Sequence, residues 1–258
     1  MSKLISFGFE IEGEMSSTCI HFLEKYGTLH GDGSINFCDI PHNKELQLRE
    51  FSSFVFLNNK TQKKNVENIF SGLQKLYDSG DFHFNETCGF HIHCGFEPKV
   101  PFEIFSVEFY EYFLNKLIDT YKEVYYKRGS NRYCKIYSKD IIEKEKGQVE
   151  VDIALETERY RGINFRPALE SHGTIEFRLF PSDVPKTMYK YLEFTLQTIT
   201  HFIKENETLK RVYGIEFDED ISESVTPIII SEVTANLKKK KRKSFSEQAL
   251  ILKTETNV

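Results

Sequence analysis

The chain has 258 residues, of which 40% are apolar and 28% charged, close to globular averages, which excludes a collagen-like, coiled-coil or disordered protein. Its 34 lysines and arginines against 39 aspartates and glutamates give a net charge of −5, so the chain as a whole is not built for non-specific binding to nucleic acid. No window reaches the ~18 uninterrupted apolar residues of a membrane helix, which argues against a membrane partner.

The cysteines and the N-terminal sequence indicate a compartment. No two of the five cysteines form a CxxC pair, and an odd number does not close a disulfide framework. The opening sequence MSKLISFGFEIEGE lacks the apolar core and the cleavage site of a signal peptide. We therefore expect a reducing, cytoplasmic location with the cysteines as small buried side chains.

The first half of the chain is predicted to contain strands and one helix. Residues 4–12 alternate strictly between apolar and polar, which is typical of a strand with one buried face. Residues 46–57 and 82–96 are predicted to be further strands. Between them, residues 61–78 carry apolar side chains at helical spacing, and Gly80 follows as a stop signal, so an amphipathic helix is predicted.

The second half adds helices and a hairpin. Pro101 is predicted to open a long helix, because proline suits the first helical turn. The alternating runs 160–167 and 173–180 predict an antiparallel hairpin, and residues 186–206 predict a third helix. Beyond this helix the regular spacing of apolar residues is lost, and the chain continues to the run KKKKRK at 238–243 and a polar end.

The order of these elements predicts an α+β fold, with a mostly antiparallel sheet covered by helices on one face. We expect a catalytic domain over residues 1–206 and a C-terminal extension over 207–258 that ends in a basic, mobile tail. The six like charges of the tail are usually just solvated, although they could contact nucleic acid or an acidic surface.

Three predicted strands carry two ionisable residues at positions i and i+2, on the side opposite their apolar residues. These pairs are Glu10/Glu12, His91/His93 and Glu176/Arg178. Same-side neighbours on a strand lie ~6–7 Å apart, so each pair can present two side chains to one cleft. Each pair alone is also compatible with a solvated outer face, although His-x-His is a recurrent metal-ligand spacing. The coincidence of three pairs, two of them flanked by glycines, favours a functional face.

Five short segments, in the same order, resemble the motifs of the amidoligase family. They are GFEIEGE at 8–14, REFSS at 49–53, TCGFHIHCG at 87–95, RGIN at 161–164 and GTIEFRLFPSD at 173–183. That family is itself similar to glutamine synthetase and glutamate–cysteine ligase, and CGFHIH and IEFRLFPSD also resemble glutamine synthetase segments. The resemblance spans residues 4 to about 200 and implies a glutamine synthetase-like catalytic sheet.

The resemblance also implies an activity, that of an ATP-dependent carboxylate–amine ligase. In such an enzyme ATP phosphorylates a carboxylate of an amino acid or peptide, and an amine displaces phosphate to leave an amide. This chemistry needs Mg²⁺ or Mn²⁺ ions, which offset the negative charge of the phosphates. The implied metal ligands are Glu10, Glu12, Glu50, His91 and Glu176.

The remaining roles follow from the same resemblance. Arg178 would stabilise the transferring phosphoryl group with its bidentate fork, and we count it with Glu12 and Glu176 as the catalytic group. His93 and Arg161 would bind the phosphates of the nucleotide.

Three further residues are implied to bind substrate. Asp32, in the sequence GDGS with Ser34, matches an Asp-x-Ser loop of the family and would contact the amine, although a plain Asp-Gly turn explains it equally well. Asn164 matches an asparagine before the hairpin and would contact the substrate carboxylate. Ser53 fits the family's Glu-x-x-Ser pattern but lacks the proline that often follows.

Two other functions stay open at this point. The segment HIHCGFE fits the first metal motif of the cupins, which would make His91, His93 and Glu97 the ligands of a single-metal barrel enzyme. A second cupin motif is absent, and three long helices do not suit a small barrel. The other alternative is a non-enzymatic binding module whose ionic face docks a partner.

Overall fold

The structure is a computed structural model that describes residues 3–38, 45–97, 100–129, 131, 134–138, 140–145, 147, 149, 160–169 and 173–213. The chain divides into two units, Met1–Asn206 and Glu207–Val258. The predicted basic tail lies outside the described residues. Among the helices that the structure describes, none combines the length and the apolar character that crossing a membrane requires.

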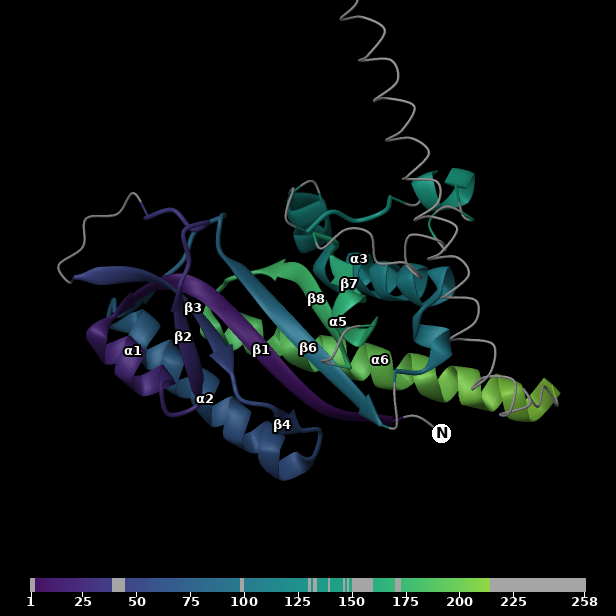
Figure 1. Ribbon diagram of the computed structural model, residues 1–258, viewed down its shortest axis with the longest axis horizontal. Coiled ribbons are helices and arrows are strands. Elements are labelled where there is room, and N and C mark those ends of the chain that lie inside the picture. The colour runs from purple at the N-terminus through teal and green to yellow at the C-terminus, as the bar shows by residue number, and fades with distance from the viewer. Residues whose placement is uncertain are drawn as a thin grey trace, which may run out of the picture. The chain divides into compact units, whose positions relative to one another are not determined.

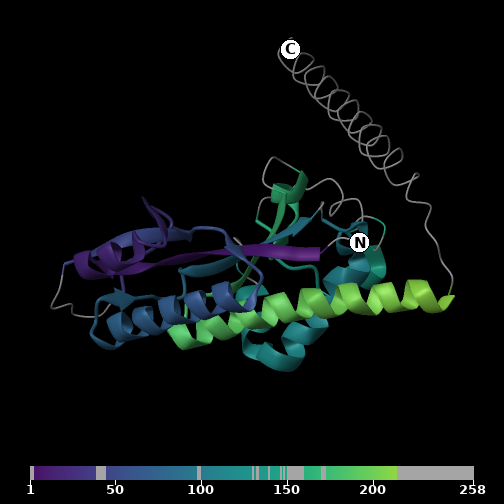
Figure 2. The same cartoon turned by 90° about the horizontal axis from the view of Figure 1, so that it is seen from below.

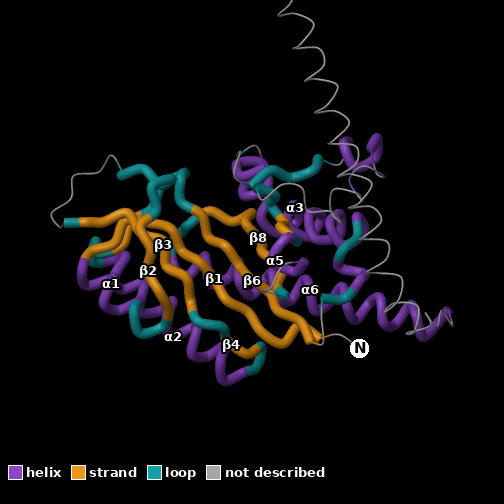
Figure 3. The backbone as a smooth tube through the Cα atoms, in the orientation of Figure 1, coloured by secondary structure: helices purple, strands orange, loops and turns teal. Residues whose placement is uncertain are grey.

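An open antiparallel sheet forms the centre of the first unit (Figures 1 and 3). Among the described residues its hydrogen-bonded order is β2-β3-β1-β6-β8-β7, and β4 and β5 pair with β1 in addition. The strands are β1 (Lys3–Ser16), β2 (Gly27–Gly31), β3 (Leu46–Ser53), β4 (Phe56–Leu57), β5 (Phe82–His83), β6 (Gly89–Glu97), β7 (Ile163–Asn164) and β8 (Thr174–Pro181). The strands pair antiparallel, as the sequence predicts.

The three long helices lie on the same face of this sheet (Figure 2). They are α2 (Lys60–Asp78), α3 (Val107–Gly129) and α6 (Pro185–Tyr213). Shorter helical segments are α1 (Ser17–Leu23), the 3₁₀ turn η1 (Phe102–Ile104) and α5 (Arg166–Leu169). The predicted mixture of helices with a mostly antiparallel sheet is therefore confirmed.

Helix α2 shows how local sequence signals define an element. Its N-cap Asn59 accepts a hydrogen bond from the Gln62 N–H at 2.9 Å. The helix buries Val66, Ile69, Phe70 and Leu73, whose helical spacing the sequence shows. Just beyond the helix, Gly80 has a φ of 72°, a conformation that glycine adopts without strain.

Phenylalanines fill the core between the sheet and the helices. The ring of Phe9 on β1 lies 5.0 Å from that of Phe70 on α2, measured between centroids, and 6.1 Å from that of Phe90 on β6. On the neighbouring strand, the Phe177 ring lies 4.7 Å from that of Phe113 on α3. This apolar face leaves the opposite face of the central strands free for polar side chains.

Two predicted strands are each divided in the structure. The run 46–57 forms β3 and β4, which pair with different parts of β1. Between them the Ser53 hydroxyl accepts the Phe9 N–H at 2.8 Å, so a side chain supplies the acceptor where the ladder is interrupted. The run 82–96 likewise forms β5 and β6, which both pair with β1.

Two predicted boundaries are wrong. The long helix begins at Val107 rather than Pro101, because Ser106 caps it by accepting the Phe109 N–H at 3.1 Å. The run 160–167 provides only the two-residue strand β7. The chain then turns into α5, where Pro167 favours a helical start and cannot extend a ladder.

Candidate active site

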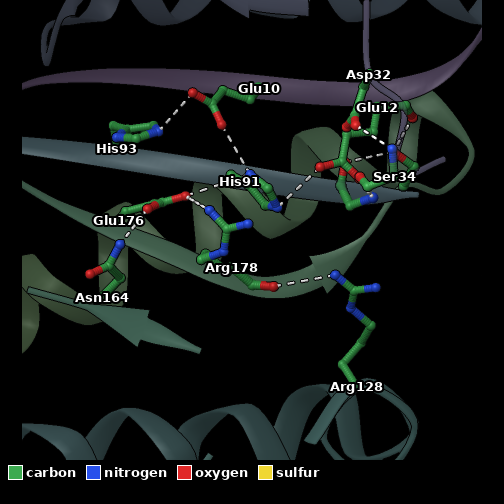
Figure 4. Close-up of polar contacts among 12 residues, drawn as sticks. Glu10, Glu12, Asp32, Ser34, His91, His93, Arg128, Asn164, Glu176 and Arg178 are labelled. Carbon is green, nitrogen blue, oxygen red and sulfur yellow. Dashed lines mark hydrogen bonds and ion pairs between the residues drawn. The ribbon is translucent and has the colours of Figure 1, made fainter. Parts of the chain in front are cut away.

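The polar face of the central strands gathers the ionisable residues predicted from the sequence (Figure 4). Register places Glu10 of β1 opposite His91 of β6, and Glu12 opposite Glu50 of β3. His93 of β6 lies opposite Glu176 of β8. The face exists because strand side chains alternate, so these residues lie opposite the phenylalanine core.

His91 lies at the centre of this group, with 3% of its surface exposed. Its Nδ1 is 3.0 Å from Glu10 Oε2 and 3.5 Å from Glu176 Oε1. Its Nε2 is 3.6 Å from Glu12 Oε1. One imidazole therefore contacts carboxylates from two different strands, β1 and β8.

Glu10 is shared by the two histidines of β6. Besides its contact with His91, its Oε1 lies 3.3 Å from His93 Nε2. Burial raises the pKa of Glu10, but its contacts with His91 and His93 outweigh burial and hold the pKa well below its usual range. Burial likewise lowers the pKa of His93, and the Glu10 carboxylate more than reverses this, so the pKa of His93 is raised. Glu10 is therefore a fixed negative charge in this site.

Glu176 is held by two donors. Asn164 Nδ2 donates to its Oε2 at 2.6 Å, and Arg178 Nη1 donates to its Oε1 at 2.5 Å. Asn164 is itself fixed, because its Oδ1 accepts the Arg166 N–H at 3.1 Å. The substrate role predicted for Asn164 is untested, but the structure makes it a direct partner of Glu176.

A bulge in β8 determines where Arg178 points. Relative to β6, β8 carries an extra residue between Phe177 and Phe180, and Arg178 lies within this irregularity. Its N–H donates to Gly162 O at 2.8 Å, next to strand β7. Bulges next to active sites commonly re-aim a side chain, and here the guanidinium reaches Glu176.

A second group of carboxylates lies beside the first. Glu12, Asp32 and Glu50 each bring an oxygen to within 4.8 Å of the others. Asp32 is fixed by the turn that it opens, since its Oδ1 accepts the Ser34 N–H at 2.7 Å. Glu12 Oε2 accepts the Gly89 N–H at 2.5 Å. The Asp-Gly turn and the functional interpretation of Asp32 are thus compatible.

The charge balance of the second group favours a cation. Burial and the nearby carboxylates of Glu10, Glu12 and Asp32 together raise the pKa of Glu50 to about 7, although His91 lowers it. Carboxylate oxygens with one imidazole are a donor set suited to Mg²⁺ or Mn²⁺. The described residues offer two candidate ligand groups: one combines two carboxylates with an imidazole (Glu10, Glu176 and His91), and the other has three carboxylates (Glu12, Asp32 and Glu50).

Some predicted residues lie apart from these groups. Ser53 is on the same sheet face, 3.5 Å from where a Cβ on Gly8 would lie, but its hydroxyl already bonds two backbone groups. Arg161 packs its guanidinium 4.1 Å from the centroid of the Tyr137 ring. Neither contact tests the phosphate or substrate role predicted for these two residues.

The cupin alternative is wrong. The sheet is open, with β2 and β7 at its two ends, rather than closed into a barrel. Glu97, at the exposed end of β6, belongs to neither of the ligand groups found among the described residues. The metal ligands of a cupin would have to face the inside of a barrel.

One residue of the site, Arg128, is missing from the sequence predictions, and Gly89 is predicted only as a glycine that flanks the His91/His93 pair. Arg128, in the last turn of α3, is buried and donates from Nη2 to Arg178 O at 3.5 Å. Gly89 allows three polar side chains to converge over its backbone, because a Cβ there would lie 2.7 Å from His91 Nε2 and 3.2 Å from both Glu12 Oε2 and Arg128 Nη2. An arginine in a last helical turn is ordinary in a sequence, so no local signal marks Arg128.

Comparison with known proteins finds one matching family model. A family model described as "Putative amidoligase enzyme" matches residues 60–199, more than half of the chain. The chain belongs to this family. No curated protein and no solved structure matches the chain. The amidoligase match contains the site residues of β6 and β8, whereas Glu10, Glu12, Asp32 and Glu50 precede it, and the sheet brings both sets to one face.

Proposed function

We propose that this protein is an ATP-dependent carboxylate–amine ligase that forms an amide through an acyl phosphate. The observation that carries the proposal is the pair of adjoining ligand groups on one sheet face, with Arg178 beside them. Membership of the amidoligase family supports a ligase that joins a carboxylate to an amine.

The two ligand groups would hold Mg²⁺ or Mn²⁺. When bound there, the ions would offset the negative charge that the phosphates of ATP and the transferred phosphoryl group concentrate in one place. The excess of carboxylates that raises the pKa of Glu50 is the feature that fits this occupant. His91 lies between the two groups, because its ring nitrogens contact carboxylate oxygens of Glu10, Glu12 and Glu176.

The reaction then takes two steps. A carboxylate oxygen of the substrate attacks the γ-phosphorus of ATP, and ADP leaves with the electrons of the broken P–O bond. The amine nitrogen attacks the carbonyl carbon of the acyl phosphate, inorganic phosphate leaves, and a proton passes from nitrogen to water. The new amide retains one oxygen of the original carboxylate, and the released phosphate carries the other.

The chain's own residues hold and orient the reactants. Glu176 fixes the Arg178 guanidinium, which would stabilise the charge that develops on the transferred phosphoryl group. His93 contributes a charged imidazole for the nucleotide phosphates, consistent with its raised pKa. Asp32 and Asn164 remain the groups proposed to contact the amine and the carboxylate.

Isotope transfer tests this proposal directly. Purified protein with Mg²⁺ and ATP is screened for ADP release against amino acids and peptides, each with an amine. A substrate that responds is then labelled with ¹⁸O in its carboxylate. Mass spectrometry should find one ¹⁸O in the released phosphate. Release of AMP, or of unlabelled phosphate, would exclude the acyl phosphate, and ATP binding without turnover would favour the binding module.

A further inference from the structure

Arg128 is a buried cation for which the described part of the chain provides no carboxylate partner. Only 6% of its surface is exposed. Among the described residues no carboxylate lies within ion-pair distance of its guanidinium, and its Nε has no hydrogen-bond partner. Its one hydrogen bond, from Nη2 to Arg178 O, is long at 3.5 Å. Burying an unpaired charge is costly, so a buried guanidinium normally has an anion beside it.

The guanidinium of Arg128 converges with polar side chains over the backbone of Gly89, where a side chain would not fit. A Cβ on Gly89 would lie 3.2 Å from Arg128 Nη2 and 2.7 Å from His91 Nε2. Figure 4 shows Arg128 reaching from its helix towards the strand that carries Arg178, below the ligand groups. The two arginines differ, because Arg178 is already paired with Glu176.

Glu12 restricts which groups Arg128 can bind here. Its Oε2 would also lie 3.2 Å from the Cβ position of Gly89, so an anion bound to Arg128 is close to a carboxylate. Two anions in one buried space repel each other unless a cation lies between them. Glu12 belongs to one of the candidate cation groups, so the cation would be available there.

We propose that Arg128, where it converges with Glu12 and His91 beside Gly89, binds a tetrahedral oxyanion of the phosphate class, together with a divalent cation held by Glu12. The phosphate identity rests on the proposed ligase function, whereas the anion site rests on the burial of Arg128. The planar guanidinium can donate two parallel hydrogen bonds to such an anion. Two sources supply this chemistry, the terminal phosphate of ATP and the free phosphate that the reaction releases.

Binding of inorganic phosphate tests the site itself. Calorimetric titration of the full chain with inorganic phosphate should detect binding in the presence of Mg²⁺ and much weaker binding without it. Arg128→Met should weaken the Mg²⁺-dependent binding by about tenfold or more, because it removes charge-assisted hydrogen bonds. Unchanged affinity in this variant, or no phosphate binding by the wild type, would overturn the proposal.

Lys127→Met is the matched control. Lys127 is the neighbouring cation in sequence, but it is exposed and pairs with Glu123 at 3.4 Å. Its loss should leave phosphate affinity unchanged, and equal losses in both variants would overturn the specific role of Arg128. If Arg128→Met does not fold, Arg128→Lys keeps the charge without the fork and should lower the affinity severalfold. An unchanged affinity there would count against the site in the same way.

Nucleotide titrations identify the source of the anion. If Arg128→Met weakens the binding of a non-hydrolysable ATP analogue more than the binding of ADP, the anion is the terminal phosphate of ATP. If both nucleotides bind unchanged while inorganic phosphate is lost, it is the released phosphate. Arg128-dependent phosphate binding without ADP release from any substrate would support the site and refute the ligase. ADP release by the wild type, together with unchanged phosphate binding in Arg128→Met, would support the ligase and refute the anion site.

Discussion

Glu12 and Glu50 lie directly opposite each other across the antiparallel strands β1 and β3. Like charges at opposed strand positions are destabilising, and Asp32 adds a third carboxylate to the same group. The fold therefore maintains a costly arrangement at its centre, which a proton or a divalent cation would relieve. Each of these two routes gives a prediction.

Replacing Glu50 by glutamine should stabilise the metal-free protein at high pH. Burial and the neighbouring carboxylates raise the pKa of Glu50 to about 7 in the folded protein, above the usual 4.5. Between these values the folded chain binds the proton more tightly than the unfolded chain, so the free energy of unfolding falls as pH rises. In EDTA at pH 8, Glu50→Gln should melt above the wild type, by about 2–4 °C per kcal/mol relieved, and the difference should shrink towards pH 5. A variant that melts lower at pH 8 would contradict this.

Divalent metal should raise the melting temperature of the wild type, since a ligand that binds only the folded state adds about 2.7 kcal/mol at one hundred times its dissociation constant. Glu12→Gln removes one charge from the ligand groups and should weaken Mn²⁺ and nucleotide binding together. Glu97→Gln, at the exposed end of β6, is the control and should respond like the wild type. Thermal unfolding with and without Mn²⁺ measures both, and a full metal response in Glu12→Gln would refute its role.

Arg178→Ala should separate binding from turnover. The phosphoryl role predicts that ATP affinity stays nearly intact while turnover falls by ~10² or more, the scale of losing one preorganised stabiliser of developing charge. Arg178→Lys keeps the charge but not the bidentate geometry, so its turnover should lie between that of the wild type and that of Arg178→Ala. Because Arg178 also pairs with Glu176, melting temperatures must be compared alongside the kinetics. Normal turnover in Arg178→Ala would remove this residue from the catalytic group.

Gly89→Ala should impair the site while leaving the fold intact. The added methyl group would lie 2.7 Å from His91 Nε2, closer than side chains normally approach, so the metal and anion contacts around it must shift. We expect clear losses of Mn²⁺ binding and of turnover. Gly147→Ala is the control, because a Cβ there meets nothing within 4 Å. Equal activity in the two variants would show that the close packing of His91, Glu12 and Arg128 around Gly89 is not needed.

Regular alternation explains what the sequence predicts well. In β1 the apolar side of Phe9 and Ile11 fixes the direction of Glu10 and Glu12, so the polar face follows from the strand alone. Strand alternation likewise fixes the faces of His91 and His93. That these pairs meet depends on the order of strands in the sheet, which the family resemblance supplies and the periodicity does not.

Irregular backbone explains what the sequence does not predict. Strict alternation would place Phe177 and Phe180 on opposite faces, but the bulge at Arg178 lets both pack against helices, with Phe180 4.8 Å from the Tyr191 ring. The sequence gives no sign of this extra residue. Arg128 reaches the site from α3, a helix that begins at Val107 rather than at the predicted Pro101. Such contacts depend on tertiary packing rather than on local pattern.

β1 precedes in the chain both strands that flank it, β3 and β6. On the ribosome the edge of this strand that pairs with β6 therefore stays unpaired until residues 89–97 have been synthesised. Such a strand is a template for aggregation with other nascent chains. Its carboxylates at Glu10, Glu12 and Glu14 oppose that pairing, because a second copy would bring like charges together. The acidic residues proposed to bind metal thus also act as gatekeepers of the newly made polypeptide.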